Sequence, residues 1–348
     1  MTPRPARKTA AALAALDRKI AGLIQRRATL VVAAPGAGKA ARFVANAPGP
    51  LGPQALRDIC NEIGSATAAL AEPQTIAFMG PAGSFTHQAA LKHFGSASTC
   101  RAADSIGEVF RLVAKGEADF GVVPVENSNE GMVSYTLDMF VDAGVTICAE
   151  VYLDIHQNLL SKTTLGKVRK VYSMPMVWGQ CRTWLATHLP HAAQADVYST
   201  ARAAELAARE PRTAAIGSTL AADIFTLDIL ARAIEDFTRN ITRFLVIGAH
   251  PAPRSARSKT SIMFSVKHHA GALYGALKPF RDAGINLTKI ESRPSKLKAW
   301  EYYFFVDLLG HEADPVVARA LGRLATHCNF VRVLGSYPNA TPCSGRPT

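Results

Sequence analysis

The sequence predicts an α/β fold: a two-lobed α/β domain with a cleft, then a ferredoxin-like βαββαβ unit, with a short α-helical segment in front. Apolar residues near the start of the chain recur at helical spacing. From residue 74 onward, short apolar runs alternate with helical patterns, which is typical of α/β domains. From residue 258 the elements follow the ferredoxin-like order. A chain of 348 residues is long enough for two or three domains.

The helical segment occupies residues 1–73, and two helices are predicted in it, over 10–34 and 54–71. The apolar residues of the first helix share one face: Leu13, Leu16, Ile20, Leu23 and Ile24. The stretch AAPGAGKA then ends this helix. It is only superficially similar to a phosphate-binding loop, because GxxxxGK(S/T) requires Gly at Ala33 and Ser or Thr at Ala40. We therefore expect a turn there.

The first lobe begins with the apolar run IAFMG, a predicted strand. A glycine turn and a helix follow in GPAGSFTHQAALKHFG, then a helix over Ser105–Lys115 and a buried strand in DFGVVPVEN. This alternation indicates a mostly parallel sheet. The run VTICAEVYLDIHQNLL predicts strands that leave the lobe.

The second lobe repeats the pattern. Strands are predicted in KVYSM, ADVYS and AAIGS, with helices over Val177–His188 and Thr200–Ala208 between them, and RNITRFLVIG returns as a strand. The two lobes together span residues 74–250. Ligands of open α/β sheets bind outside the carboxyl ends of the strands, so we expect a cleft there.

The C-terminal unit spans residues 258–340, after the basic linker AHPAPRSARSK. Strands are predicted in TSIMFSV, INLTKIESRP, WEYYFFVDLLG and FVRVLGSYP. Helices are predicted in GALYGALKPFRDAG and over Pro315–Cys328, which completes the βαββαβ order. Residues 341–348 are expected to form a frayed tail.

The formal net charge of +12 does not choose between partners. The positive residues are dispersed, and no basic helix is interleaved with aromatics as in nucleic-acid-binding segments. A small anionic substrate fits equally well, because a positive field steers anions toward the protein. The six cysteines form no CxxC pair and the ten histidines show no ligand spacing, so we expect free thiols and no metal.

No apolar run reaches the roughly 18 residues of a membrane span, and no signal-peptide pattern is present at the start. We therefore expect a cytoplasmic protein. An organellar transit peptide is the competing interpretation, because the first 45 residues carry nine Lys or Arg and one acid, Asp17.

Hydroxyl, amide and arginine side chains recur where predicted strands end or the following helices begin. They are Ser84, Thr86, Glu126, Asn127, Ser128, Ser173, Gln180, Ser199, Thr200, Asn240, Thr242 and Arg243. Such groups suit carboxylate recognition. Each of them alone is an ordinary helix cap or turn residue, and only their recurrence at equivalent places favours an anion site. Their spacing names no reaction.

Over about residues 74–340 the chain resembles the prephenate dehydratase family. The matching stretches occur in order: GPAGSFT, GVVPVENSNEGMVSYTLD, QCRTWL, IED, NITRFLVIG, GALYGAL and ESRP. The resemblance implies a periplasmic-binding-protein-like catalytic domain. It also implies a carbon–oxygen lyase that converts prephenate to phenylpyruvate, water and CO2 in L-phenylalanine biosynthesis, without a cofactor.

The resemblance also implies residue roles. Thr242 of the TRF triplet is expected to donate to or position the leaving hydroxyl, with Asn240, Arg243 and Glu126 beside it. Arg243 is expected to pair with a substrate carboxylate, with Glu126 or with Asp236; an internal salt bridge is the alternative. The implied substrate contacts are Ser84, Phe85, Asn127, Ser128, Ser173, Gln180, Thr200 and Phe244.

The C-terminal unit resembles an ACT domain, which in this family binds phenylalanine between two protomers. The implied pocket residues are Gly271, Ala272 and Leu273 of GALY, and Asn286, Glu291, Ser292, Arg293 and Pro294 from the partner chain. This implies feedback inhibition and a homodimer or homotetramer. A purely dimerising domain is the alternative.

The sequence departs from the family in three places. Ala270 stands where proline often precedes GALY, and SMPM places Met174 and Met176 where the family has polar groups. The segment ALDRKIAGLIQRR resembles the first helix of a helical chorismate mutase, with Arg27 at an active-site position, and ICNEIGSATAAL resembles its last helix. The stretch between them is too short, and Ala10 stands near the place of a further arginine.

This N-terminal region is therefore interpreted as a degenerate, inactive mutase remnant. Three alternatives to a prephenate dehydratase stay open. They are an arogenate dehydratase, a bifunctional chorismate mutase/prephenate dehydratase, and a non-enzymatic amino-acid-sensing protein.

Overall fold

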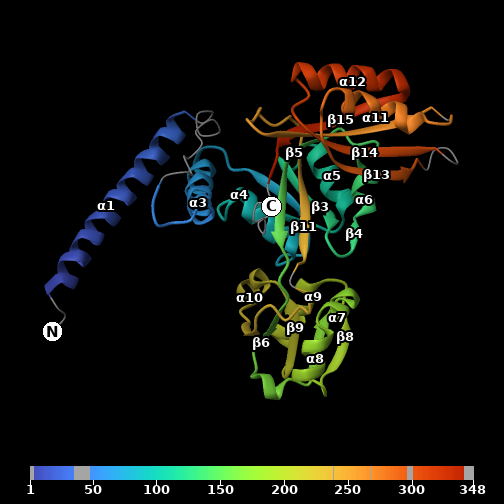
Figure 1. Ribbon diagram of the computed structural model, residues 1–348. Coiled ribbons are helices and arrows are strands. Elements are labelled where there is room, and N and C mark those ends of the chain that lie inside the picture. Colours follow the sequence, from blue (N-terminus) through green and yellow to red (C-terminus); the bar gives the residue numbers. More distant parts are fainter. Residues whose placement is uncertain (1–3, 35–47, 238, 268, 296–300, 341–348) are drawn as a thin grey trace. The chain divides into compact units, whose positions relative to one another are not determined.

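A computed structural model describes residues 4–34, 48–237, 239–267, 269–295 and 301–340 (Figure 1). Most of the AAPGAGKA turn and the predicted tail lie outside these ranges. The chain divides into two compact units, residues 1–75 with 90–99, and residues 76–89 with 100–348, and each is described by itself.

The first unit contains the two predicted N-terminal helices, α1 (Arg4–Ala33) and α3 (Pro53–Ala71), and both predictions are confirmed. The helices pack on each other near Ala28 and Val31, and Arg27 donates a hydrogen bond to Thr67 Oγ1. The predicted apolar face of α1 is largely exposed: Leu13, Leu16, Ile20 and Leu23 each keep 53–57% of their surface accessible. No helix in the described part of the chain is both long and apolar enough to cross a membrane.

The sheet of the first lobe has the strand order β2-β1-β3-β11-β5, with β4 paired to β3. β1 and β3 are parallel, but β11 runs antiparallel to both β3 and β5. The expected mostly parallel sheet is therefore wrong, because the chain returns from the second lobe in the opposite direction. The elements are β1 (Thr75–Met79), α4 (Phe85–Phe94), β2 (Thr99–Ala103), α5 (Ile106–Ala114), β3 (Phe120–Asn127), β4 (Gly131–Met132), α6 (Ser134–Met139), β5 (Thr146–Asp154) and β11 (Ile241–Gly248).

The sheet of the second lobe has the order β10-β6-β9-β7-β8 and is also mixed. The helix predicted over Val177–His188 is two helices that break at Cys181. The strand predicted in ADVYS lies earlier, because Ser199 caps the next helix by accepting from Arg202 N. The elements are β6 (Asn158–Ser161), a 3-10 turn (Leu165–Lys167), β7 (Lys170–Ser173), α7 (Pro175–Gln180), α8 (Arg182–His188), β8 (Ala193–Asp196), α9 (Thr200–Arg209), β9 (Thr213–Gly217), α10 (Thr219–Phe225) and β10 (Asp228–Ala231).

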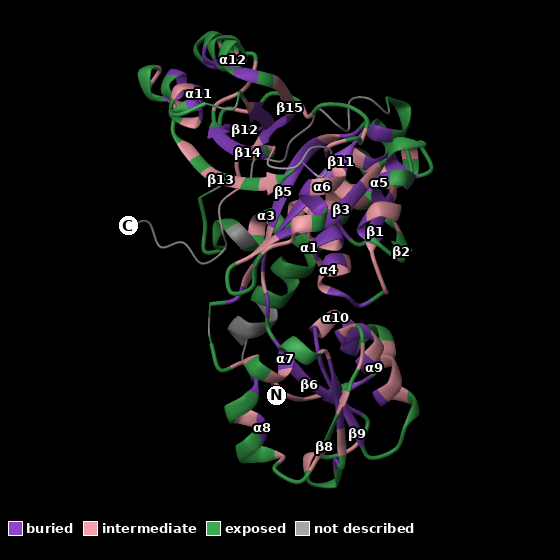
Figure 2. Ribbon diagram, turned by 90° about the vertical axis from the view of Figure 1, so that its right-hand side faces the viewer, coloured by how far each residue is buried: buried purple, intermediate pink, exposed green. Residues whose placement is uncertain are grey.

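Five short elements have no counterpart in the prediction: β2, β4, α6, α10 and β10. They hold two to seven residues each, too few for an apolar period to appear. The buried strands at the centres of both lobes, coloured purple in Figure 2, are the elements that the apolar runs did locate.

The C-terminal unit has the predicted βαββαβ order, and its sheet runs β13-β14-β12-β15 with antiparallel neighbours throughout. Side chains alternate between two covered faces. Phe264 and Val306 pack under the two helices, whereas Met263 and Phe305 join the core of the first lobe. Figure 1 shows α11 and α12 on the outer face. The elements are β12 (Ser258–Val266), α11 (Ala272–Asp282), β13 (Leu287–Pro294), β14 (Tyr302–Leu309), α12 (Pro315–His327) and β15 (Cys328–Pro338).

Candidate active site

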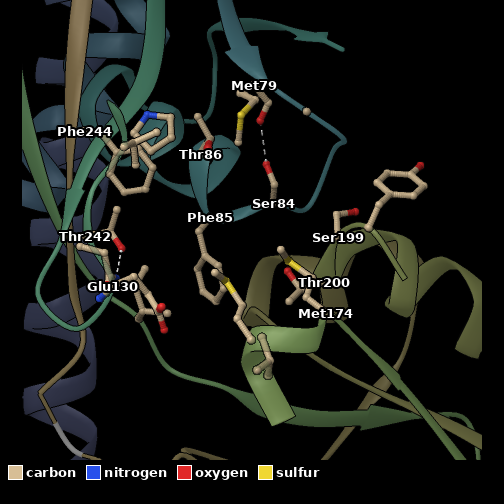
Figure 3. A pocket seen from close by; sticks show the side chains of 18 of the residues that line it. Met79, Ser84, Phe85, Thr86, Glu130, Met174, Ser199, Thr200, Thr242 and Phe244 are labelled. Atoms are coloured by element: carbon tan, nitrogen blue, oxygen red, sulfur yellow. Dashed lines mark hydrogen bonds between the residues drawn. The ribbon is translucent and has the colours of Figure 1, made fainter. Parts of the chain in front are cut away.

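A cavity of about 790 Å³ is lined by residues of both lobes (Figure 3). The first lobe contributes the turn before α4 and the ends of β3 and β11. The second lobe contributes the starts of α7 and α9. Two segments that cross between the lobes complete the lining with Ile155, Gln157 and Asn240. The cleft that the sequence predicts at the strand ends is therefore present.

Three polar side chains form a hydrogen-bonded cluster in this cavity. Asn127 Nδ2 donates to Thr242 Oγ1 at 2.8 Å and to Asn240 Oδ1 at 2.7 Å. The other end of the amide is fixed, because Asn127 Oδ1 accepts from the backbone N–H groups of Asn129 and Glu130 at 2.9 and 3.0 Å. Thr242 thus accepts from Asn127, and its hydroxyl proton is left to donate to a ligand.

A chain of amides continues from this cluster toward the second lobe. Gln180 Oε1 accepts from Gln157 Nε2 at 3.3 Å and from Asn240 Nδ2 at 3.4 Å, and Gln180 Nε2 donates to Glu130 Oε1 at 3.2 Å. Gln157 is 2% exposed, and its Oε1 has no hydrogen-bond partner among the described residues. The cavity therefore holds an acceptor that water or a ligand hydroxyl can satisfy.

Two helices begin at the cavity, one from each lobe. Ser84 precedes α4 and accepts from His87 N, while Ser199 precedes α9 and accepts from Arg202 N. The first backbone N–H groups of a helix have no partner within the helix and carry partial positive charge, which favours anions. The charged side chains of the described lining are Asp104 and Glu130, and no Lys, Arg or His belongs to it. The donors that the described lining offers to an anion are therefore neutral groups.

Most of the predicted site residues come together in this cavity. Those that line it are Ser84, Phe85, Asn127, Gln180, Thr200, Asn240, Thr242 and Phe244, and Met174 and Met176 line it as well. Four predicted residues do not line it: Glu126, Ser128, Ser173 and Arg243.

Arg243 points to the other face of the sheet from Thr242, as neighbouring strand residues do. It is 6% exposed, and its Nε and Nη1 lie 2.9 Å from Glu150 and 2.7 Å from Asp307. Burial lowers the pKa of Arg243, but these acids outweigh burial and raise it overall. The expected pairing with a substrate carboxylate does not fit this placement, and the internal salt bridge is what the structure shows.

Of the two acids that the sequence assigned to Arg243, Glu126 is a partner at the limit of ion-pair distance and Asp236 is not a partner. Glu126 lies 3.9 Å from the guanidinium but bonds Lys289 Nζ at 2.7 Å, and Asp236 accepts from Thr183 N instead. Sequence adjacency placed Arg243 beside Thr242, but it could not show which acids the C-terminal unit brings to it.

The two serines outside the cavity have structural surroundings. Ser128 Oγ accepts from Ile241 N at 3.0 Å, and so joins the end of β3 to the start of β11. Ser173 is fully buried, and its Oγ has no hydrogen-bond partner within the described ranges. Neither side chain lines the cavity, and contact of either with a substrate stays a prediction.

The sequence missed two residues that matter for the site, Gln157 and Glu130. Gln157 occupies a segment that leaves the first lobe, and Glu130 follows the ENSN turn. Glu130 follows the end of the predicted strand DFGVVPVEN by three residues, whereas Gln157 lies inside the run VTICAEVYLDIHQNLL that was predicted as strands, so its position gave no signal.

The residues implied for phenylalanine binding lie on two elements of the C-terminal unit. Gly271 precedes α11 with φ of +77°, a left-handed conformation that suits glycine, and Ala272 and Leu273 begin the helix. The ESRP residues 291–294 lie on β13, at the edge of the sheet, and Asn286 directly precedes that strand. Ligand binding at these residues stays a prediction.

The family model for prephenate dehydratase matches residues 76–252, and that for the ACT domain matches residues 260–326. A bifunctional chorismate mutase/prephenate dehydratase of Aquifex aeolicus is 48% identical over 288 residues, covering 82% of this chain and 80% of the relative. The crystal structure of a prephenate dehydratase from Arthrobacter aurescens in complex with L-Phe is 33% identical with a TM-score of 0.70, over 78% of this chain and 93% of that one. A solved chain called GqqA, described as a novel type of quorum quenching acylase, is 28% identical with a TM-score of 0.71, over 77% and 98% of the two chains.

Proposed function

Because this chain belongs to the prephenate dehydratase family, we propose that the cavity around Thr242 converts prephenate to phenylpyruvate, water and CO2. The observation that carries the proposal is the cluster of Thr242, Asn127 and Asn240 at a cavity shared by two lobes. It presents one hydroxyl donor with a fixed orientation, which is what a departing ring hydroxyl requires.

The reaction breaks two bonds between the substrate ring and its substituents, the bond to one carboxylate and the bond to the hydroxyl. The electron pair of the bond to the leaving carboxylate moves into the ring as CO2 departs, and the ring hydroxyl takes up one proton from solvent and leaves as water. Thr242 donates a hydrogen bond to that hydroxyl as negative charge develops on it. A threonine hydroxyl is too weak an acid to release its proton fully, so Thr242 acts by stabilising charge in a preorganised site.

The substrate carries two carboxylates, and the cavity meets them with neutral donors at the starts of α4 and α9, together with Thr200. An ion pair would hold the departing carboxylate most strongly before it loses its charge. Hydrogen bonds from neutral groups hold the charged carboxylate less strongly than an ion pair would. Less binding energy is therefore lost as the carboxylate becomes CO2, which favours the transition state over the ground state. The overall charge of +12 attracts the dianion to the protein without placing a cation beside it.

Nothing in the cavity favours acyl transfer. Its described lining contains no His and no Cys, so neither a Ser–His nor a Cys–His pair is present there. The prephenate reaction needs no such pair.

The regulation and assembly that we propose follow the architecture. L-phenylalanine binds the ACT domain and lowers turnover, in a cytoplasmic homodimer or homotetramer with closed symmetry. The ACT-domain match and the L-Phe complex of a 33% identical relative support this. The N-terminal helices act as an inactive mutase remnant; Arg27 is engaged by Thr67 within the α1–α3 pair.

The test is turnover of prephenate to phenylpyruvate by the wild type and by two matched variants at one position. Thr242→Val keeps the shape and removes the hydroxyl, so kcat is expected to fall by about two to three orders of magnitude. Thr242→Ser keeps the hydroxyl and retains most of the activity. A Thr242→Val variant that turns over prephenate at the wild-type rate would remove the basis of the proposal.

Parallel reactions with arogenate and chorismate separate the alternatives. Faster turnover of arogenate would assign the protein to the amino-bearing substrate. Turnover of chorismate would show an active N-terminal segment. Adding millimolar L-phenylalanine to each reaction tests the regulation.

A further inference from the structure

The inner face of the ACT-domain sheet contacts the first lobe through charged side chains as well as apolar ones. Lys259 and Ser261 of β12 and Asp307 of β14 are all buried on this face. They surround Arg243, the residue that follows Thr242. The lobe and the ACT domain therefore share a buried ionic cluster directly behind the cavity.

Within the cluster, side chains of the lobe and of the ACT domain form hydrogen bonds and ion pairs with one another. Glu150 of β5 accepts from Arg243 Nε and from Lys259 Nζ, both at 2.9 Å. Asp307 lies 2.7 Å from Arg243 Nη1 and accepts from Ser261 Oγ at 2.5 Å. Tyr337 OH accepts from Arg243 Nη2 at 3.1 Å. Three of these contacts cross between the domains: Glu150 with Lys259, Arg243 with Asp307, and Arg243 with Tyr337.

A second ion pair crosses the same boundary on β13. Lys289 Nζ lies 2.7 Å from Glu126 Oε2, and the lysine side chain is only 14% exposed. Lys289 stands between Asn286 and Glu291, two of the residues implied for phenylalanine binding. The strand expected to sense phenylalanine therefore contacts the catalytic lobe through this lysine, and also through Arg293, which lies 3.3 Å from Asp138 of α6.

Both ion pairs lie one residue away from the active-site residues along the paired strands β11 and β3. Arg243 lies opposite Glu126 across β11 and β3, and Thr242 lies opposite Asn127. The ACT domain holds the first of these pairs, and the second lines the cavity. A bulge follows Arg243 in the pairing with β3, whereas the pairing of β11 with β5 is regular at Thr242 and Arg243.

We propose that Lys289 and Asp307 of the ACT domain are positioning residues for the dehydratase site, which hold the Glu126–Arg243 pair and thereby set the geometry of the neighbouring Asn127–Thr242 pair. This deepens the proposed function and rests on it. A displacement of β13 by a bound ligand alters its contacts with the lobe, and among them Lys289–Glu126 lies one residue away from the donor to Thr242. Neither residue lines the cavity, although Lys289 Nζ contacts the Sδ of Met132, which does.

The experiment compares Lys289→Met with Lys289→Arg and with Lys278→Met, all as full-length protein. Lys278 forms an exposed pair with Asp282 on α11, so its variant repeats the same chemical change in the same domain at a surface site. The readouts are kcat and KM for prephenate, the melting temperature, L-phenylalanine binding by calorimetry, and the suppression of kcat by L-phenylalanine.

We expect Lys289→Met to lower kcat about tenfold while KM changes less than about threefold, and to weaken suppression by bound L-phenylalanine by a similar factor. Lys289→Arg, which keeps the cation, restores most of kcat, and Lys278→Met behaves as the wild type. Asp307→Asn is expected to lower kcat further. If that variant does not fold, Lys289→Met decides alone, because Glu126 is 41% exposed and water can solvate it.

The outcomes are distinguishable. A wild type that turns over prephenate, with a Lys289→Met variant that keeps the kcat and phenylalanine response of Lys278→Met, overturns the positioning role alone. A loss of melting temperature without a change in kcat also overturns it, because it shows a purely structural contact. A wild type without prephenate turnover overturns the proposed function, and the positioning role with it.

Discussion

Removing the charge of Glu150 by Glu150→Gln tests the energetic weight of the ionic cluster. The Glu150 side chain is fully buried and accepts from three groups at 2.9 Å: Arg243 Nε, Lys259 Nζ and the backbone N–H of Ala340. Glutamine has nearly the same shape and keeps one acceptor oxygen. The substitution therefore changes the charge far more than the packing.

The expected loss of stability follows from the contacts that Arg243 and Lys259 keep after the substitution. Arg243 keeps Asp307, but Lys259 has no second carboxylate among its described ion pairs and stays buried. Breaking a buried pair by removing one partner costs about 3–5 kcal/mol. For a protein of this size, that corresponds to a fall in melting temperature on the order of 10 °C.

Scanning calorimetry of Glu150→Gln and of the control Glu205→Gln measures this. Glu205 also bridges two arginines, Arg202 and Arg209, but on the surface of α9, and its loss is expected to cost below about 1 kcal/mol. Adding Lys259→Met to Glu150→Gln removes the unpaired cation, so part of the loss returns. Equal melting temperatures for the two single variants would refute the reasoning.

Three further predictions concern other parts of the chain. Asn127→Asp replaces the donor to Thr242 with an acceptor, so the threonine proton turns toward the new carboxylate and kcat falls about a hundredfold in the prephenate assay; an unchanged kcat would contradict this role. Gly335→Ala places a Cβ 2.8 Å from the backbone nitrogen of Ile147, and denaturant unfolding is expected to show a loss of about 1–3 kcal/mol, which a variant of wild-type stability would disprove. Burial lowers the pKa of His93 from 6.5 to about 4, so between these pH values the unfolded chain binds more protons than the folded chain, and stability falls as pH falls. Urea titrations are expected to show about 2 kcal/mol less stability at pH 5 than at pH 7. The variant His93→Gln is expected to remove this difference, and a variant that keeps it would assign the pH dependence to another group.

The sequence located the elements that carry a strong apolar signal. The buried strands β3, β9, β11 and β12 and the ferredoxin-like order follow from such runs. Strand direction did not follow, because β11 crosses back from the second lobe and only the tertiary fold decides which way it runs beside β3. The short edge elements were missed for lack of length.

The sequence predicted those cavity residues that stand at the ends of predicted strands. Thr242 and Asn127 were found in this way, and the structure adds the hydrogen bond between them. The contacts of Arg243 could not be predicted in this way. Its position beside Thr242 favoured a substrate contact, but strand alternation turns it to the other face, where Asp307 arrives from 64 positions later in the chain. No local pattern contains that pairing.

The crossing segments between the lobes give the cavity a mechanical property. Ile155 N donates to Asn240 O at 2.7 Å, and Ile234 N donates to Gln157 O at 2.8 Å, so the outgoing and returning chains are bound together as one hinge. Three of these four residues also line the cavity: Ile155, Gln157 and Asn240. The same residues thus join the two lobes and form part of the cavity wall. A substitution at Ile155, Gln157 or Asn240 is therefore expected to alter the link between the lobes and the cavity at the same time.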